Sequence, residues 1–83
     1  MDERTKLARS YIKGITTKEE FNSLLDKLFI SDVEREVIED LYVKGSNMDL
    51  IADKLGYSAP TVKAIHKRVL IKISSYIYQH TNL

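Results

Sequence analysis

The sequence predicts an all-α fold, a single small domain of five short helices that contains a helix-turn-helix. Three observations predict it. Apolar residues recur every three or four positions along most of the chain, as they do on one face of an α-helix. Helix-capping residues stand between these segments, and each of the three glycines follows one of them. With 83 residues, the chain has room for one core and not for two independent ones.

The first two predicted helices form an N-terminal extension over residues 1–30. The first runs from Asp2 to Lys13 and ends before Gly14. The second opens with the capping box Thr17-Lys18-Glu19-Glu20, in which the threonine and the acid three positions later satisfy each other's N–H groups. The predicted apolar stripes are Leu7, Ala8, Tyr11 and Ile12 in the first helix, and Phe21, Leu24, Leu25 and Leu28 in the second.

The third predicted helix also begins with a capping box, Ser31-Asp32-Val33-Glu34. It runs to about Lys44, and Gly45 caps it. Either Ser46 or Asn47 then caps the fourth helix. The side chains expected on the buried face of the third helix are Val33, Val37, Ile38, Leu41 and Tyr42.

The last two helices are predicted over Met48 to Leu55 and from about Ala59 to Tyr76 or beyond, and together they form the helix-turn-helix. Gly56 lies between them and can adopt the positive φ that ends a helix. Ser58 is a good N-cap for the last helix. Pro60 falls in its first turn, where the missing N–H costs little. Such a unit presents one exposed helix end to the major groove of DNA.

Composition excludes several classes of protein. Cysteine is absent, which excludes disulfides and thiolate metal sites and suits a reducing compartment. No apolar run approaches the ~20 residues that span a bilayer, and no signal-peptide core follows the N-terminus. We therefore expect a cytoplasmic protein with no membrane partner. Residues 79–83 are expected to be frayed.

No constellation of catalytic or metal-binding residues stands out. His66 and His80 lack a second ligand at metal spacing, and no glycine-rich phosphate loop occurs. We expect His66 at the surface near a phosphate and His80 in the frayed tail. The acidic pairs Glu19-Glu20 and Glu39-Asp40 are typical of helix surfaces. The sequence thus predicts no enzyme activity, no cofactor and no metal.

Charge is distributed unevenly, although the formal net charge is only +1. Residues 31–57 hold seven acids and three bases, whereas residues 58–83 hold no acid and four bases. A segment with bases alone, on the helix presumed to read DNA, is the pattern expected of a DNA contact. The alternative is that an acidic and a basic helix simply attract each other within one fold. The four bases are Lys63, Lys67, Arg68 and Lys72.

Several short motifs in residues 31–73 occur together at a consistent spacing. They are Ser31-Asp32-Val33-Glu34-Arg35-Glu36-Val37-Ile38, Leu41-Tyr42-Val43-Lys44-Gly45, Ile51-Ala52, Leu55-Gly56-Tyr57-Ser58, Thr61-Val62-Lys63 and Arg68. With them, residues 31–78 resemble region four of bacterial sigma-70 factors and the related LuxR-type domains. The other parts of a sigma factor do not occur in the chain. The resemblance therefore implies a stand-alone regulator, of a type common in bacteria and their phages, and it leaves residues 1–30 unassigned.

The resemblance also implies which residues contact DNA. Lys63 is the strongest candidate for a base contact, because an ammonium group can reach O6 and N7 of guanine. Ser58 is an N-cap and, with Thr61, offers a hydroxyl beside the helix N-terminus, where a phosphate is favoured. The family's base-contacting positions fall on Ala59, Pro60, Lys63, Ala64 and Lys67.

Two alternatives stay open for these bases. Lys63 and Lys67 could be ordinary solvated lysines rather than DNA contacts. Arg68 either touches the DNA backbone or pairs with Glu34, or with another acid of the third helix, as a structural bridge.

The last helix carries more apolar side chains than one core face needs. Leu70 and Ile77 lie one face away from its main stripe and seven residues apart. Either the first two helices cover them, or they meet their symmetry mates in a homodimer through the C-terminal helix. Such a dimer would present two reading helices to a repeated site.

The leading hypothesis is a sequence-specific DNA-binding transcriptional regulator whose partner is double-stranded DNA. One alternative is a phage subunit for DNA packaging or replication that uses the same helix-turn-helix within a ring. The other is a protein-binding adaptor that docks on RNA polymerase without reading DNA. Steep salt dependence of binding would separate the DNA-binding hypotheses from the adaptor.

Overall fold

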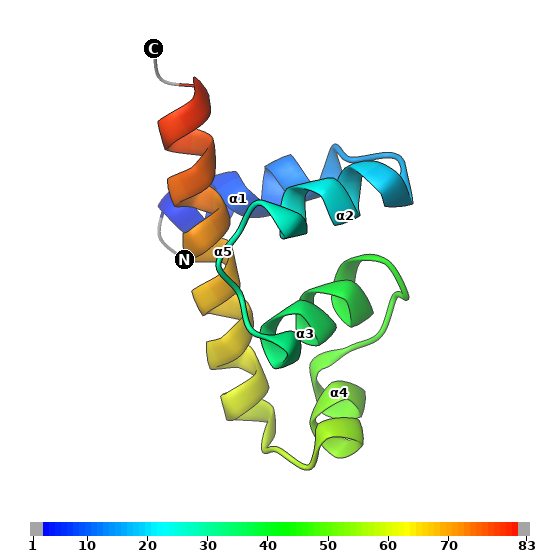
Figure 1. The fold of residues 1–83 in the computed structure, drawn as a ribbon. Helices are drawn as coiled ribbons and strands as arrows, with labels where there is room; N and C mark the ends of the chain where they lie inside the picture. Colours follow the sequence, from blue (N-terminus) through cyan, green and yellow to red (C-terminus); the bar gives the residue numbers. More distant parts are fainter. Residues whose placement is uncertain (1–2, 82–83) are drawn as a thin grey trace.

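The computed structural model describes residues 3–81, and this part of the chain is all-helical, with five α-helices and no strand (Figure 1). The predicted fold class is therefore confirmed. The five elements are α1 (Glu3–Lys13), α2 (Lys18–Asp26), α3 (Asp32–Tyr42), α4 (Met48–Leu55) and α5 (Ala59–Thr81).

Three predictions about C-terminal ends need correction. The second helix ends at Asp26, so Leu28, which the prediction places on its stripe, lies beyond the helix and is partly buried against a core cluster. The third helix ends at Tyr42, two residues earlier than expected, and Gly45 follows it at a φ of +70°. The fifth helix continues to Thr81, so the backbone of residues 79–81 is helical rather than frayed. The predicted start at Asp2 and the last two residues, 82 and 83, lie outside the described residues.

The long helix α5 is the axis on which the others are arranged. Figure 1 shows α1 and α2 beside its C-terminal half and α3 and α4 beside its N-terminal half. Direct packing joins α5 to α1, to α3 and to α4. One unbroken helix therefore runs through both the N-terminal extension and the helix-turn-helix.

Buried apolar side chains form two clusters along this axis. The extension core lies where α1, α2 and the C-terminal half of α5 meet, and it includes Ile38 of α3. The helix-turn-helix core lies between α3, α4 and the N-terminal half of α5. The extension core consists of Ala8, Ile12, Phe21, Leu25, Ile38, Val69, Leu70, Ile73 and Ile77. The helix-turn-helix core consists of Val37, Ile51, Ala52, Val62 and Ile65.

The apolar excess of α5 is covered within the monomer. Leu70 is 1% exposed and Ile77 is 7% exposed, and both belong to the extension core. The interpretation that the first two helices cover them is therefore correct. The predicted homodimer requires these two side chains to be exposed. That premise is wrong, because both are buried in one cluster with residues of α1 and α2.

The stripe predicted for α1 is also displaced. The buried residues of α1 are Thr5, Ala8 and Ile12, which follow one another at helical spacing. Leu7 and Tyr11 were expected in the core but are exposed. They flank the buried stripe, because α1 meets its neighbours along one narrow side only.

Side-chain caps fix where the shorter helices begin. The full capping box of α3 is present, because Ser31 Oγ accepts from the Glu34 N–H (3.2 Å) and the Ser31 N–H donates to Glu34 Oε1 (2.9 Å). For α2, the Thr17 hydroxyl accepts from the N–H of residue 20, which is the first half of the predicted box. Asn47, rather than Ser46, caps α4 and accepts from the N–H of residue 50.

Candidate nucleic-acid interface

The turn between α4 and α5 has the geometry that the sequence predicts. Gly56 ends α4 in the left-handed conformation, with φ +75° and ψ +26°. Its N–H and that of Tyr57 both donate to the carbonyl oxygen of Ala52, and the second distance is 2.9 Å. The paired bonds close the last turn of α4 and redirect the chain within three residues. Ala52 is buried, which lets α4 lie close to α5.

The first turn of α5 is organised by two hydroxyl groups. Ser58 Oγ accepts from the Thr61 N–H at 3.4 Å, which makes Ser58 the N-cap. The two hydroxyls also share a hydrogen bond of 2.9 Å. Only one of them can donate in that bond, so the hydrogen of the other hydroxyl is left for an outside acceptor. Both side chains are exposed at the helix N-terminus, where a phosphate oxygen is a favourable acceptor.

The predicted contact residues come together on one outward side of α5. Val62, Ile65 and Val69 point into the cores, as expected for the opposite side. Among the eight predicted positions Ala59 is half-buried, and seven are exposed: Ser58, Pro60, Thr61, Lys63, Ala64, Lys67 and Arg68. All of them lie in or just before the first three turns of the helix.

The bases farther along α5 are engaged by the fold itself. Lys72 donates to both carboxylate oxygens of Glu34 (3.0 and 3.2 Å) and to the carbonyl of Phe29 (2.8 Å). Arg68 lies 3.8 Å from the same carboxylate and remains 59% exposed. Burial raises the pKa of Glu34, but the Ser31 N–H and the Lys72 ammonium together lower it below its ordinary value. The attraction between the third and fifth helices is therefore real, and it is centred on Lys72.

Other acids of α2 and α3 pair with bases of α3 and α4. Arg35 pairs with Asp26 at 2.9 Å and with Glu39 at 3.0 Å. Lys54 of α4 pairs with Glu36 and with the buried Asp40. By contrast, Lys63 and Lys67 make no ion pair with any residue that the structure describes. The bases at the N-terminal end of α5 are thus available to an outside anion.

A groove runs alongside this face, and we refer to it as the α1–α5 groove. Its walls include Thr5 and Arg9 of α1, and Pro60, Lys63, Ala64 and Lys67 of α5. Four predicted contact residues therefore share one hollow with two residues of the N-terminal extension. Sequence reasoning does not connect Arg9 with the reading helix, because residues 1–30 fall outside the family resemblance. Its spacing of four from the buried Thr5 is the one signal that places it beside a neighbouring helix.

His66 was expected at the surface, and this expectation is wrong. The residue is 7% exposed, and its Nε2 lies 2.8 Å from the Tyr42 hydroxyl of α3. Burial, together with the positive charge of Arg9, lowers the pKa of His66 to about 4. Burial raises the pKa of Tyr42, and Arg9 opposes that increase. His66 is therefore a neutral core residue at pH 7. The side chain of His80 lies outside what the structure describes.

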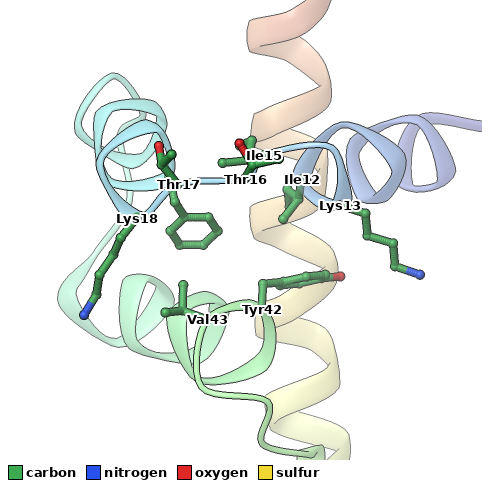
Figure 2. Close-up of a pocket in the computed structure, with 9 residues that line it drawn as sticks. Ile12, Lys13, Ile15, Thr16, Thr17, Lys18, Tyr42 and Val43 are labelled. Carbon is green, nitrogen blue, oxygen red and sulfur yellow. The ribbon is translucent and has the colours of Figure 1, made fainter.

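A second cleft lies away from the reading helix, between the end of α1, the start of α2 and the end of α3 (Figure 2). Tyr42 and Val43 form one side of it, and Lys13 and Lys18 extend to either side of the opening in Figure 2. Its lining contains no acid and no histidine. The cleft shares no lining residue with the predicted interface.

Across residues 3–81 there is no group of three or more His, Cys, Asp or Glu side chains placed to hold a metal ion. None of the helices in that range is long and apolar enough to cross a membrane.

Comparisons of the chain with protein-family models, with characterised proteins and with solved structures found no match. The resemblance of residues 31–78 to region four of sigma-70 factors therefore stays a prediction from the motifs.

Proposed function

We propose that the protein is a sequence-specific DNA-binding regulator of transcription, with α5 as its recognition helix. One observation carries the proposal. On the exposed first turns of a helix-turn-helix, Lys63 and Lys67 have no ion pair among the described residues, whereas Lys72 on the same helix is held by Glu34. The family resemblance supports the same positions. An outward face with unneutralised bases at the end of such a unit suits the major groove of DNA.

In this proposal each residue type has a separate task. Lys63 contacts a base edge, because its ammonium matches the two acceptors of guanine in the major groove. Ala59, Pro60 and Ala64 allow close approach, and a methyl group can contact thymine. Ser58 and Thr61 bind a phosphate through the hydroxyl hydrogen that their shared bond leaves over, and this contact sets the register. Lys67 and Arg68 add backbone contacts at the far edge of the face.

A monomer presents only one such helix, which sets an upper limit on affinity. Single modules bury about 600–1,000 Å² on DNA and rely strongly on phosphate contacts. Leu70 and Ile77 no longer support a dimer, so a second anchor must come from elsewhere on the chain or from a partner protein.

Selection of bound sites from random duplexes, by the full chain, tests the proposal. We expect enrichment of one short motif, and binding that weakens steeply as salt increases. The mass of the complex should correspond to a few copies of the chain; a closed ring would favour the DNA-packaging or replication alternative. No enriched motif and no salt-dependent binding to any duplex would contradict DNA recognition.

The adaptor alternative has one observation in its favour. Phe29, in the connection between α2 and α3, is 97% exposed, and Leu50 and Tyr78 are also large exposed apolar side chains. Such residues are typical of contacts with another protein. An adaptor would bind purified RNA polymerase without DNA, and Phe29→Ala would weaken that binding.

A further inference from the structure

Arg9 is the unusual charge of the N-terminal extension. Its side chain is half-buried between α1 and α5, and its Nε is fully buried without a hydrogen-bond partner. Among the described residues, no carboxylate pairs with it. Its polar neighbours are the Tyr42 hydroxyl and His66, and His66 is neutral at pH 7. Arg9 is thus a partly desolvated cation without a counter-ion within residues 3–81.

A desolvated cation of this kind is costly unless an anion meets it. Buried donors are nearly always satisfied, and a buried guanidinium is normally paired. The α1–α5 groove that Arg9 lines also contains Lys63 and Lys67, and no acid lines it. Three cations around one hollow, without an acid, are suited to a ligand with more than one negative oxygen.

We propose that the α1–α5 groove is a phosphate-binding site, and that Arg9 binds a phosphodiester of the DNA backbone there. This inference rests on the proposed function. The planar guanidinium matches the oxygens of a phosphate in a two-point contact. A phosphate that draws the side chain into the groove also gives the buried Nε an acceptor. Because the groove adjoins Pro60 and Ala64 on the reading face, the phosphate belongs to the strand beside the bases that α5 contacts.

The inference gives residues 1–30 a task that the family resemblance leaves unassigned. By packing α1 across α5, the extension adds a second anchor next to a single recognition helix. The anchor compensates for the missing second copy of the reading helix. It is independent of base sequence, because a phosphate contact sets position and carries no sequence information.

The test compares duplex binding by the wild type, Arg9→Gln and the matched control Lys13→Gln. Lys13 is an exposed base at the C-terminal end of α1, about one turn beyond Arg9, and lines the second cleft instead. We expect Arg9→Gln to lose about tenfold in affinity on both a selected duplex and a random duplex. The slope of log affinity against log salt should fall by about one. Lys13→Gln should match the wild type.

A second measurement needs no variant and therefore does not depend on how Arg9→Gln folds. The Nε–H resonance of Arg9 is followed by NMR in the wild type during titration with the selected duplex. We expect this resonance to shift and to reach its end point as the duplex saturates the protein. A resonance that stays in place at saturation contradicts the inference.

Free phosphate is the other source of the same chemistry, and it is tested separately. Inorganic phosphate that shifts the Arg9 resonance, alongside a duplex that does not, would assign the groove to a free phosphate ion and overturn the DNA contact. A wild type that binds duplex DNA, with Arg9→Gln binding equally well at the same salt slope, overturns this inference alone. A wild type that binds no duplex overturns the proposed function as well.

Discussion

The two halves of α5 have similar residues, but their basic side chains lie in different surroundings. Each half has an apolar side that packs into a core, and each has basic residues on another side. In the N-terminal half, Lys63 and Lys67 face solvent beside the helix-turn-helix. In the C-terminal half, Lys72 is held by Glu34 and by a backbone carbonyl, while Leu70 and Ile77 are covered. The comparison shows that a basic helix becomes a candidate contact surface only where the acids of its own fold do not reach it.

The largest effect is expected from charging the covered half. Leu70→Lys together with Ile77→Lys places two ammonium groups in the extension core, where neither has a partner acid. We expect the helical circular-dichroism melt to disappear. Tyr78→Lys, on the exposed side of the same half, is the matched control and should melt like the wild type. A folded double variant that changes only from dimer to monomer in light scattering would restore the dimer hypothesis.

The next effect is the dependence of stability on pH, which we expect to come from the buried His66. The pKa of His66 is lowered to about 4, so the unfolded chain binds its proton first as pH falls. Stability is then fully present above about pH 6.5 and is lost as pH falls toward about 4, with a total on the order of 3 kcal/mol. The check is urea unfolding at several pH values in this window.

His66→Gln is the control for that measurement, because glutamine does not titrate. The variant should show a flatter dependence between pH 6.5 and 4.5, above the range in which the carboxylates begin to contribute. Glu34, whose pKa is lowered, contributes stability that is lost only when pH falls below its ordinary range. An equally steep dependence without His66 would mean that another group is responsible.

A change at the turn should affect the N-terminal half most directly. Gly56→Val forces a β-branched residue to a φ of +75°, which costs on the order of 1–3 kcal/mol. An added Cβ would meet no atom within 4 Å, so the penalty is backbone strain rather than a clash. Thermal melting should show a lower midpoint, and Gly56→Asn, which tolerates this conformation better, should lose less. Equal midpoints for the two variants would contradict the strain argument.

The smallest effects on the fold are expected from replacing one lysine in each half of α5. These two variants also test most directly whether the halves differ in function. We expect Lys63→Ala to weaken specific DNA binding by about 1–3 kcal/mol and to relax the preference at one base pair. Lys72→Ala should instead lower stability and leave the DNA affinity of the folded chain unchanged. Fluorescence anisotropy and melting of both variants measure the two quantities. Identical behaviour of the two variants would remove the distinction between the halves.

Local signals in the sequence predicted much of the fold and part of the site. The capping box of Ser31 and Glu34 and the helix-ending role of Gly56 depend on bonds to residues fewer than six positions away. Both roles therefore follow from the sequence pattern alone. The outward positions of Lys63 and Lys67 follow in the same way from the period of one helix.

The remaining features depend on how α1 lies across α5, which no local pattern specifies. That crossing covers Leu70 and Ile77, buries His66 against Tyr42, and brings Arg9 to the reading face. From the sequence, the covering of Leu70 and Ile77 is one of two open alternatives, the prediction for His66 is wrong and Arg9 has no assigned role, because the partners are far apart along the chain. The sequence analysis names Arg68 as a possible partner of Glu34, whereas the distances place Lys72 closer to that carboxylate.

The continuity of α5 has a consequence for how the protein opens. The helix has 23 residues, which corresponds to about 34 Å, and it contains no glycine and no proline after Pro60. Val69, in its middle, is fully buried where the two cores adjoin. Its amide can exchange with solvent only when both ends of the molecule have loosened. Hydrogen exchange should therefore be slowest there, so that the centre of one helix reports the free energy of global unfolding.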